Sequence, residues 1–126
     1  MSKLETPLTR RYWESVGGTL IEEFLAVPSS PDNGPRRVDA VIILDGPKRI
    51  AKQREVDIEG KDIIVVQTKA SRLGMYLMGQ LVFSKELMKK HNPKSVKSVA
   101  VCTKGDSVLQ PLLDKFEDVE VVVYDD

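Results

Sequence analysis

The chain has few residues of the types that form disulfides or zinc sites. Its 126 residues include one cysteine and one histidine. An internal disulfide is therefore excluded, and Cys102, within the apolar residues 99–103, is expected to be a small buried side chain. A Cys/His cluster and a glycine-rich phosphate loop are both missing, which disfavours structural zinc and nucleotide-dependent enzymes.

Long apolar runs are also missing. None approaches the length of a membrane span, and the first residues lack the apolar stretch of a signal peptide. The sequence therefore predicts a soluble, cytoplasmic protein. The length suits a single domain over residues 1–126, which would bury about two-thirds of its unfolded surface.

The charge is zero overall but unevenly distributed along the chain. Residues 61–105 carry nine Lys and Arg against two Asp and Glu, whereas residues 106–126 carry one against seven. A basic block often marks contact with a polyanion such as nucleic acid. A solvated helix face rich in lysine explains it equally well.

Apolar periodicity and turn residues predict the element order α-β-β-β-α-β-α-β. The predicted helices are residues 7–16, 72–91 and 107–116, and the predicted strands are residues 19–27, 37–44, 62–69, 98–103 and 119–124. Thr6 and Ser71 are the expected N-caps of the first two helices. Residues 48–59 lack a clear period and are expected to form a short helix or an irregular crossing. The first three strands should pair antiparallel and the last three parallel.

The long predicted helix should bury one face on the sheet. That face is formed by residues at three- and four-residue spacing: Leu73, Tyr76, Leu77, Leu81, Ser84, Leu87 and Met88. Gly74 and Gly79 lie within the same segment. They are expected to mark close packing, since glycine otherwise weakens a helix.

Polar side chains interrupt two of the apolar strands. Asp39 lies near the start of one, and Gln67, Thr68 and Lys69 end the next. Strand alternation places Gln67 and Lys69 on one face and Thr68 on the other. A carboxylate, a carbonyl oxygen and an ammonium suit a hard divalent cation beside a phosphate substrate. A salt bridge between Asp39 and Lys69 is the alternative, but buried pairs add little net stability, so we favour a functional site.

These residues resemble the core motif of the PD-(D/E)xK nuclease superfamily, an Asp on one strand and (Glu/Asp)-x-Lys on the next. Asp39 and Gln67-x-Lys69 occupy these places, and the Gln variant is similar to that of Mrr-type restriction endonucleases and some RecB-like nucleases. The resemblance implies an α/β fold with a restriction-endonuclease-like mixed β-sheet flanked by helices. The order of elements fits an α-β-β-β-α-β core plus an α-β extension.

The resemblance also implies a set of catalytic roles. Asp39, Gln67 and a Glu of the first helix, which is Glu14 here, would hold Mg²⁺ or Mn²⁺. The metal would activate a water and counter the charge of the scissile phosphate. Lys69 would position that water or stabilise the transition state.

The third carboxylate has alternatives in the sequence. Glu14 could instead pair on the helix surface with Arg10 or Arg11, which lie one turn earlier. Glu22 and Glu23 lie on opposite faces of the first strand. One of these two is therefore a second candidate ligand.

Four further residues are candidates for nucleic-acid contact. Arg36, Arg37 and Arg72 are next to the proposed site in sequence and could bind phosphates, or could be ordinary surface charges. Gln80 resembles the helix glutamine of RecB-like nucleases, which belongs to a Gln-x-x-x-Tyr pattern. Ser84 holds the Tyr position here.

The sequence is therefore interpreted as a metal-dependent nuclease-like domain that hydrolyses phosphodiester bonds, with DNA as the expected partner. One alternative is a catalytically inactive nuclease-fold module acting in nucleic-acid binding or protein-protein assembly. Another is a small α/β regulatory domain that dimerises through a sheet edge. A chain this short has no obvious target-recognition module, so a homodimer or a subunit of a larger complex is also considered.

Overall fold

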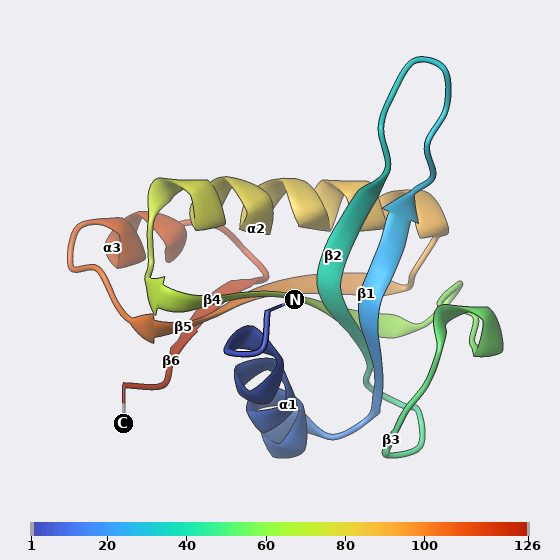
Figure 1. Ribbon diagram of the computed structural model, residues 1–126, viewed down its shortest axis with the longest axis horizontal. Helices are drawn as coiled ribbons and strands as arrows, with labels where there is room; N and C mark the ends of the chain where they lie inside the picture. The colour runs from blue at the N-terminus through green and yellow to red at the C-terminus, as the bar shows by residue number, and fades with distance from the viewer. Residues whose placement is uncertain (1, 126) are drawn as a thin grey trace.

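The computed structural model describes residues 2–125 as a mixed α/β fold (Figure 1). In chain order the elements are α1 (Glu5–Val16), β1 (Thr19–Val27), β2 (Arg36–Ile43), β3 (Arg49–Ile50), β4 (Asp62–Arg72), α2 (Met75–Met88), β5 (Ser95–Lys104), α3 (Leu109–Leu113) and β6 (Val119–Val123). Short 3-10 turns occupy Gln53–Glu55 and Lys89–His91. Within this described part, the helices are all too short or too polar to cross a membrane.

The six strands form one curled sheet in the order β3-β1-β2-β4-β5-β6. β2 is antiparallel to both β1 and β4, whereas β4, β5 and β6 run parallel. The predicted pairing of the five main strands is therefore confirmed. β3 was not predicted, because two residues beside β1 are too short to show a strand period.

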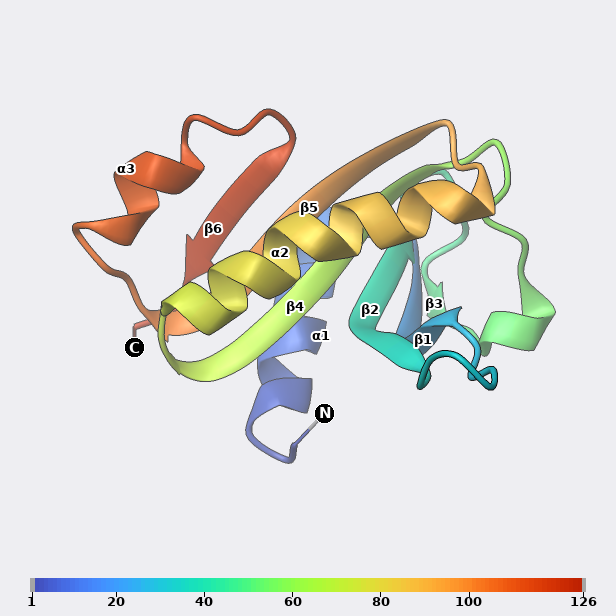
Figure 2. The same cartoon turned by 90° about the horizontal axis from the view of Figure 1, so that it is seen from above.

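Helices cover both faces of the sheet, with α1 on one side and α2 on the other (Figure 2). β4 contributes to both cores because its side chains alternate. Ile64 and Val66 pack with Trp13 of α1, whereas Ile63 and Val65 lie in the core at the C-terminal end of α2. A third cluster joins the N-terminal half of α2 to β5 and α3, and it contains the buried Cys102, as predicted.

The first two helix starts differ from the prediction. α1 begins at Glu5, and the N–H of Glu5 donates to the Ser2 hydroxyl at 3.2 Å, so Thr6 lies inside the first turn and is not the N-cap. α2 begins at Met75, because β4 continues alongside β5 as far as Arg72. Ser71 is consequently a strand residue, and its predicted capping role is wrong.

The predicted buried face of α2 is correct only in part. Leu77, Leu81, Ser84 and Met88 are buried, but Tyr76 is 84% exposed. A Cβ atom added at Gly74 or Gly79 would meet nothing within 4 Å, so the expected close packing is wrong at both glycines. The apolar residues of α2 are distributed around the whole helix, so their spacing alone could not predict which side faces the sheet.

Two contacts fix α1 against the sheet. The indole N–H of Trp13 donates to the carbonyl of Gly18 at 2.8 Å. Gly18 has φ +79°, and a Cβ atom there would collide with the Ile43 carbonyl, so the tight connection into β1 requires glycine. Nearer its start, α1 is bound to β4 by a 2.7 Å hydrogen bond between the hydroxyls of Thr9 and Thr68. These contacts bring the first turn of α1 to the end of β4.

Candidate functional site

A polar cluster lies where β2 and β4 diverge. Antiparallel pairing of these strands ends at Ala40 and Val66, and β2 then continues with β1 into an arm beyond the sheet (Figure 1). The N–H of Thr68 donates to Asp39 Oδ2 at 2.8 Å, and the N–H of Asp39 donates to Gln67 Oε1 at 3.4 Å. Side chains thus replace the backbone partners that the diverging strands no longer supply.

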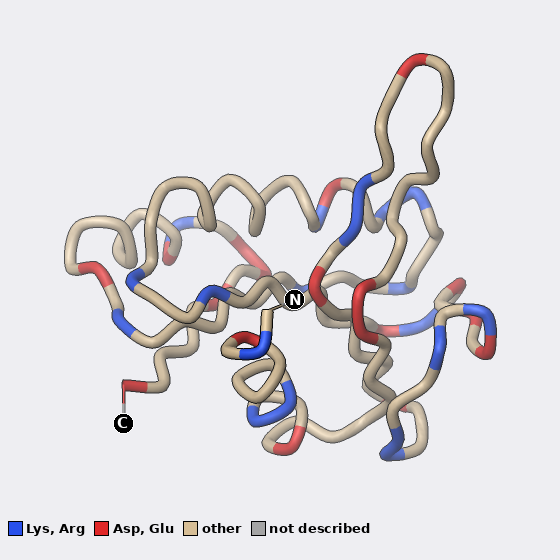
Figure 3. The backbone as a smooth tube through the Cα atoms, in the orientation of Figure 1, with Lys and Arg blue, Asp and Glu red and all other residues tan. Residues whose placement is uncertain are grey.

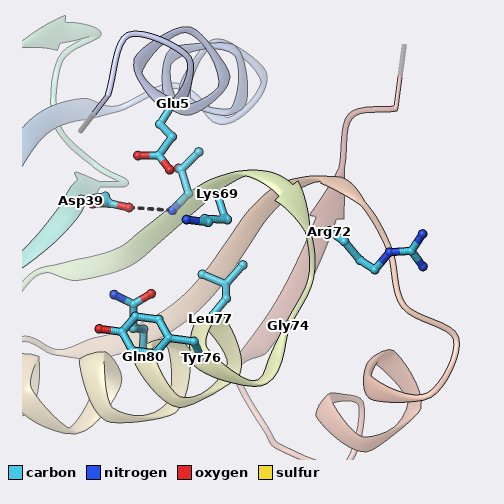
Figure 4. Close-up of a pocket in the computed structure, with 9 residues that line it drawn as sticks. Glu5, Asp39, Lys69, Arg72, Gly74, Tyr76, Leu77 and Gln80 are labelled. Atoms are coloured by element: carbon cyan, nitrogen blue, oxygen red, sulfur yellow. Dashed lines mark hydrogen bonds between the residues drawn. The ribbon is translucent and has the colours of Figure 1, made fainter.

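A pocket of about 340 Å³ opens beside this cluster (Figure 4). The side chains of Glu5, Asp39 and Lys69 gather on one side of it, from α1, β2 and β4 respectively. Tyr76 and Gln80 line the opposite side from α2. Three charged groups from separate elements therefore meet at one place, and sequence reasoning had identified two of them.

The environment of Asp39 makes its negative charge costly. Burial raises the pKa of the Asp39 carboxyl, and the hydrogen bond from Thr68 opposes that rise. The nearby carboxylates of Glu5 and Glu23 raise this pKa further. A cation held beside Asp39 would offset both the cost of burying its charge and the repulsion from its neighbours. Carboxyl groups with a shifted pKa are common in functional sites.

Lys69 is exposed and does not form the salt bridge considered as the alternative. Asp39 bonds the Thr68 backbone instead. Among residues 2–125, no carboxylate lies within ion-pair distance of the Lys69 ammonium. This ammonium can therefore meet an anionic group that enters the pocket.

Gln67, a predicted metal ligand, forms hydrogen bonds to two neighbouring elements. Its side chain is buried, and its carbonyl oxygen accepts the N–H of Asp39. Its amide nitrogen donates to the Ser84 hydroxyl at 2.7 Å. Gln67 thus ties β2, β4 and α2 together, and its carbonyl oxygen, the one atom of this side chain suited to bind a metal, accepts one hydrogen bond.

Glu14 lies away from the pocket. Its carboxylate pairs with Lys48 at 2.8 Å, and neither Arg10 nor Arg11 is its partner. Glu5 lines the pocket instead, nine residues earlier, which is about 13 Å along the helix axis. Because the predicted helix began at residue 7, Glu5 fell outside it, and only a correct helix start could have identified this residue.

The other candidate acids are placed as follows. Glu22 forms hydrogen bonds of 2.8 and 3.2 Å with the guanidinium of Arg10, which binds β1 to α1. Glu23 has a left-handed backbone, with φ 53°, and lies in β1 between Glu22 and Phe24, which pair with the two neighbours of Asp39 in β2. It influences Asp39 through its charge but does not line the pocket.

The predicted nucleic-acid contacts fall into two groups. Arg36 and Arg37 line a second groove along α2, together with Gln80, which also lines the pocket. Arg72 lies at the rim of the pocket, but its side chain points away from Asp39 and Lys69 (Figure 4). Of these four predicted contacts, only Gln80 lines both the pocket and the second groove.

The basic block of residues 61–105 does not form one continuous basic face. Its charges are spread over several elements (Figure 3). Lys85 pairs with Asp118 at 3.8 Å, and Lys97 pairs with Glu120, so the acidic C-terminal segment offsets part of the block. This arrangement favours the solvated-surface explanation for these lysines.

Two acidic side chains of the pocket could bind a divalent cation. Residues 2–125 contain no group of three or more His, Cys, Asp or Glu that could hold a metal. Mg²⁺, however, keeps several waters and needs only one or two carboxylates plus substrate phosphates. Asp39 and Glu5 supply two carboxylates to the pocket, which fits such a water-rich site and not a closed protein cage.

Comparison of the chain with known protein families, with curated proteins and with solved structures finds no match. The chemistry of the pocket is therefore the basis on which its function must be argued.

Proposed function

We propose that the chain is a metal-dependent nuclease-like domain that hydrolyses phosphodiester bonds in DNA. The convergence of Asp39, Glu5 and Lys69 beside the diverging strands supports this proposal most strongly. A restriction-endonuclease-like fold of the PD-(D/E)xK superfamily is part of the same proposal. The mixed sheet with helices on both faces is consistent with it.

The residues of the pocket have separate roles in this mechanism. Asp39 and Glu5 hold Mg²⁺ or Mn²⁺, which when bound supplies an activated water and offsets phosphate charge. The Thr68 N–H fixes one oxygen of Asp39 and leaves the other for the ion. Lys69 approaches the phosphate as a cation and stabilises the charge that develops on its oxygens. Gln67 positions Asp39 by accepting its backbone N–H.

A second candidate is an inactive nuclease-fold module that binds nucleic acid or serves as one subunit of a larger assembly. The partners of Gln67 favour it, since hydrogen bonds to β2 and α2 give this side chain a structural role that needs no metal. The two candidates share the fold and the pocket. They differ in whether a phosphodiester bond is cut.

The test is cleavage of single- and double-stranded DNA in Mg²⁺ or Mn²⁺. Asp39→Asn and Lys69→Met should each lower the rate about 100-fold or more, as expected for loss of transition-state charge stabilisation. Glu5→Gln should also lower it, whereas Glu14→Gln, on the same helix, should not. Circular dichroism of each variant checks that it is folded. If the wild-type chain cuts neither substrate in either metal, the inactive module is the correct reading.

A further inference from the structure

A second cavity continues from the pocket. It is a groove of about 500 Å³ between α2 and the start of β2, and it shares Tyr76 and Gln80 with the Asp39 pocket. Arg36 and Arg37 line its other wall, at the start of β2, where the hairpin arm leaves the sheet (Figure 1). A ligand lying in the groove would therefore end at the proposed catalytic residues.

The α2 wall of the groove exposes aromatic rings. Tyr76 is 84% exposed and Phe83 is 70% exposed, although the whole chain has only three tyrosines and three phenylalanines. The two residues are two helical turns apart, about 10 Å along the axis, so each ring can contact a separate group. Apolar surface of this kind on a helix that faces solvent typically marks an interaction site.

The opposite wall carries positive charge. Arg36 and Arg37 are both exposed. One guanidinium N–H of Arg36 donates to the carbonyl oxygen of Pro35, and one of Arg37 donates to the carbonyl oxygen of Glu23. Neither forms an ion pair with a carboxylate in the described part of the chain. The described residues that line the groove include no acid.

We propose that this groove binds single-stranded DNA and leads it into the pocket, an inference that rests on the proposed function. The arginines contact phosphates, and the rings of Tyr76 and Phe83 stack on bases, the combination used by proteins that bind single strands. In a duplex each base is already stacked between its neighbours, so these rings would find no partner. A second copy of the chain fits poorly, because two such faces would bring four arginines together without an acid.

The test measures binding without metal, so that cleavage plays no part. Anisotropy of a labelled 12-nucleotide single strand in EDTA should show tighter binding than for a duplex of the same sequence. Tyr76→Ala and Phe83→Ala should each weaken single-strand binding about tenfold, the expected loss of one stacked base. Tyr76→Phe should retain affinity. Phe116→Ala removes another exposed ring, 49% exposed and outside the groove, and should change nothing.

The arginines are tested through salt dependence. Each phosphate contact on a single strand contributes about −0.7 to the slope of log K against log salt. Arg36→Gln and Arg37→Gln should each reduce the slope by about that amount. Arg54→Gln, an exposed arginine of the 3-10 turn, should leave it unchanged.

The outcomes separate this inference from the proposed function. Selective single-strand binding without any cleavage supports the groove and refutes only the nuclease. Equal binding of the duplex, tighter binding of RNA of the same sequence, or no effect of Tyr76→Ala and Phe83→Ala would overturn the inference, even if the chain cuts DNA. Sedimentation showing a dimer that these two variants dissociate would also overturn it, because the face would then be a contact between copies.

Discussion

Replacing Asp39 with asparagine separates the functional role of this carboxylate from its structural role. The side chain keeps its shape, and its amide oxygen can still accept the N–H of Thr68. What disappears is a charge that is partly buried and lies near Glu5 and Glu23. If the charge is retained for chemistry, the variant should lose activity without losing stability.

The expected magnitude follows from two opposing effects. A hydrogen bond to a charged acceptor contributes about 1.5–3 kcal/mol and one to a neutral acceptor about 0.5–1.5, so asparagine loses about 1 kcal/mol at Thr68. The pKa of Asp39 is raised even with the Thr68 hydrogen bond in place, so the folded state disfavours the charge, and removing that charge opposes this loss. We therefore expect Asp39→Asn to be at least as stable as wild type at pH 7. Asp39→Ala leaves the Thr68 N–H unpaired and should cost about 1–3 kcal/mol.

Urea denaturation across pH provides the assay. The pKa of Asp39 is higher in the folded state than in the unfolded chain, so the folded state binds more protons between these two values. Wild-type stability from this group should rise as the pH falls through that window, and the advantage of asparagine should vanish there. A variant that is less stable than wild type by more than about 1 kcal/mol at pH 7 would refute the reasoning.

Three further predictions concern buried groups. Ser84→Ala removes the acceptor of the Gln67 amide and should lower the free energy of unfolding by about 1–3 kcal/mol, measured in urea; an unchanged value would mean that Gln67 finds another partner. Burial, the largest cause, raises the pKa of Tyr12 to about 12. Stability should therefore fall as the pH rises from about 10, where an unfolded tyrosine ionises, toward 12, and ultraviolet titration should show Tyr12 ionising only with unfolding. Burial also raises the pKa of the Cys102 thiol, so a thiol reagent should modify it only as the chain unfolds, and fast labelling of the native protein would contradict its placement.

The sequence predicted the order and pairing of the main strands because apolar alternation and turn residues report on local structure. Helix ends were less predictable. Serine is a common N-cap residue, but β4 continues past Ser71 because β5 provides backbone hydrogen-bond partners as far as Arg72. Tyr76 was placed in the core, although it is exposed, because α2 is apolar on every side.

The site was predictable only where its residues interrupt apolar strands. Asp39 and Lys69 are conspicuous there, and the structure brings both to the pocket. The roles of Glu5 and Ser84 could not be predicted in this way. The place of Glu5 in the pocket depends on where α1 begins, and the contact of Ser84 with Gln67 depends on which face α2 buries. The partners of Gln67 are likewise 28 and 17 residues away in sequence, beyond any local pattern.

The central claim, that Asp39 and Glu5 hold a divalent cation in the pocket, is tested most directly by anomalous diffraction from crystals soaked in Mn²⁺. We expect a peak within about 2.0–2.6 Å of an oxygen of each carboxylate, the range of hard cations in proteins. Glu14, paired with Lys48, should show none. A crystal without a peak at Asp39, or with its peak at Glu14, would show that these two carboxylates do not hold the cation.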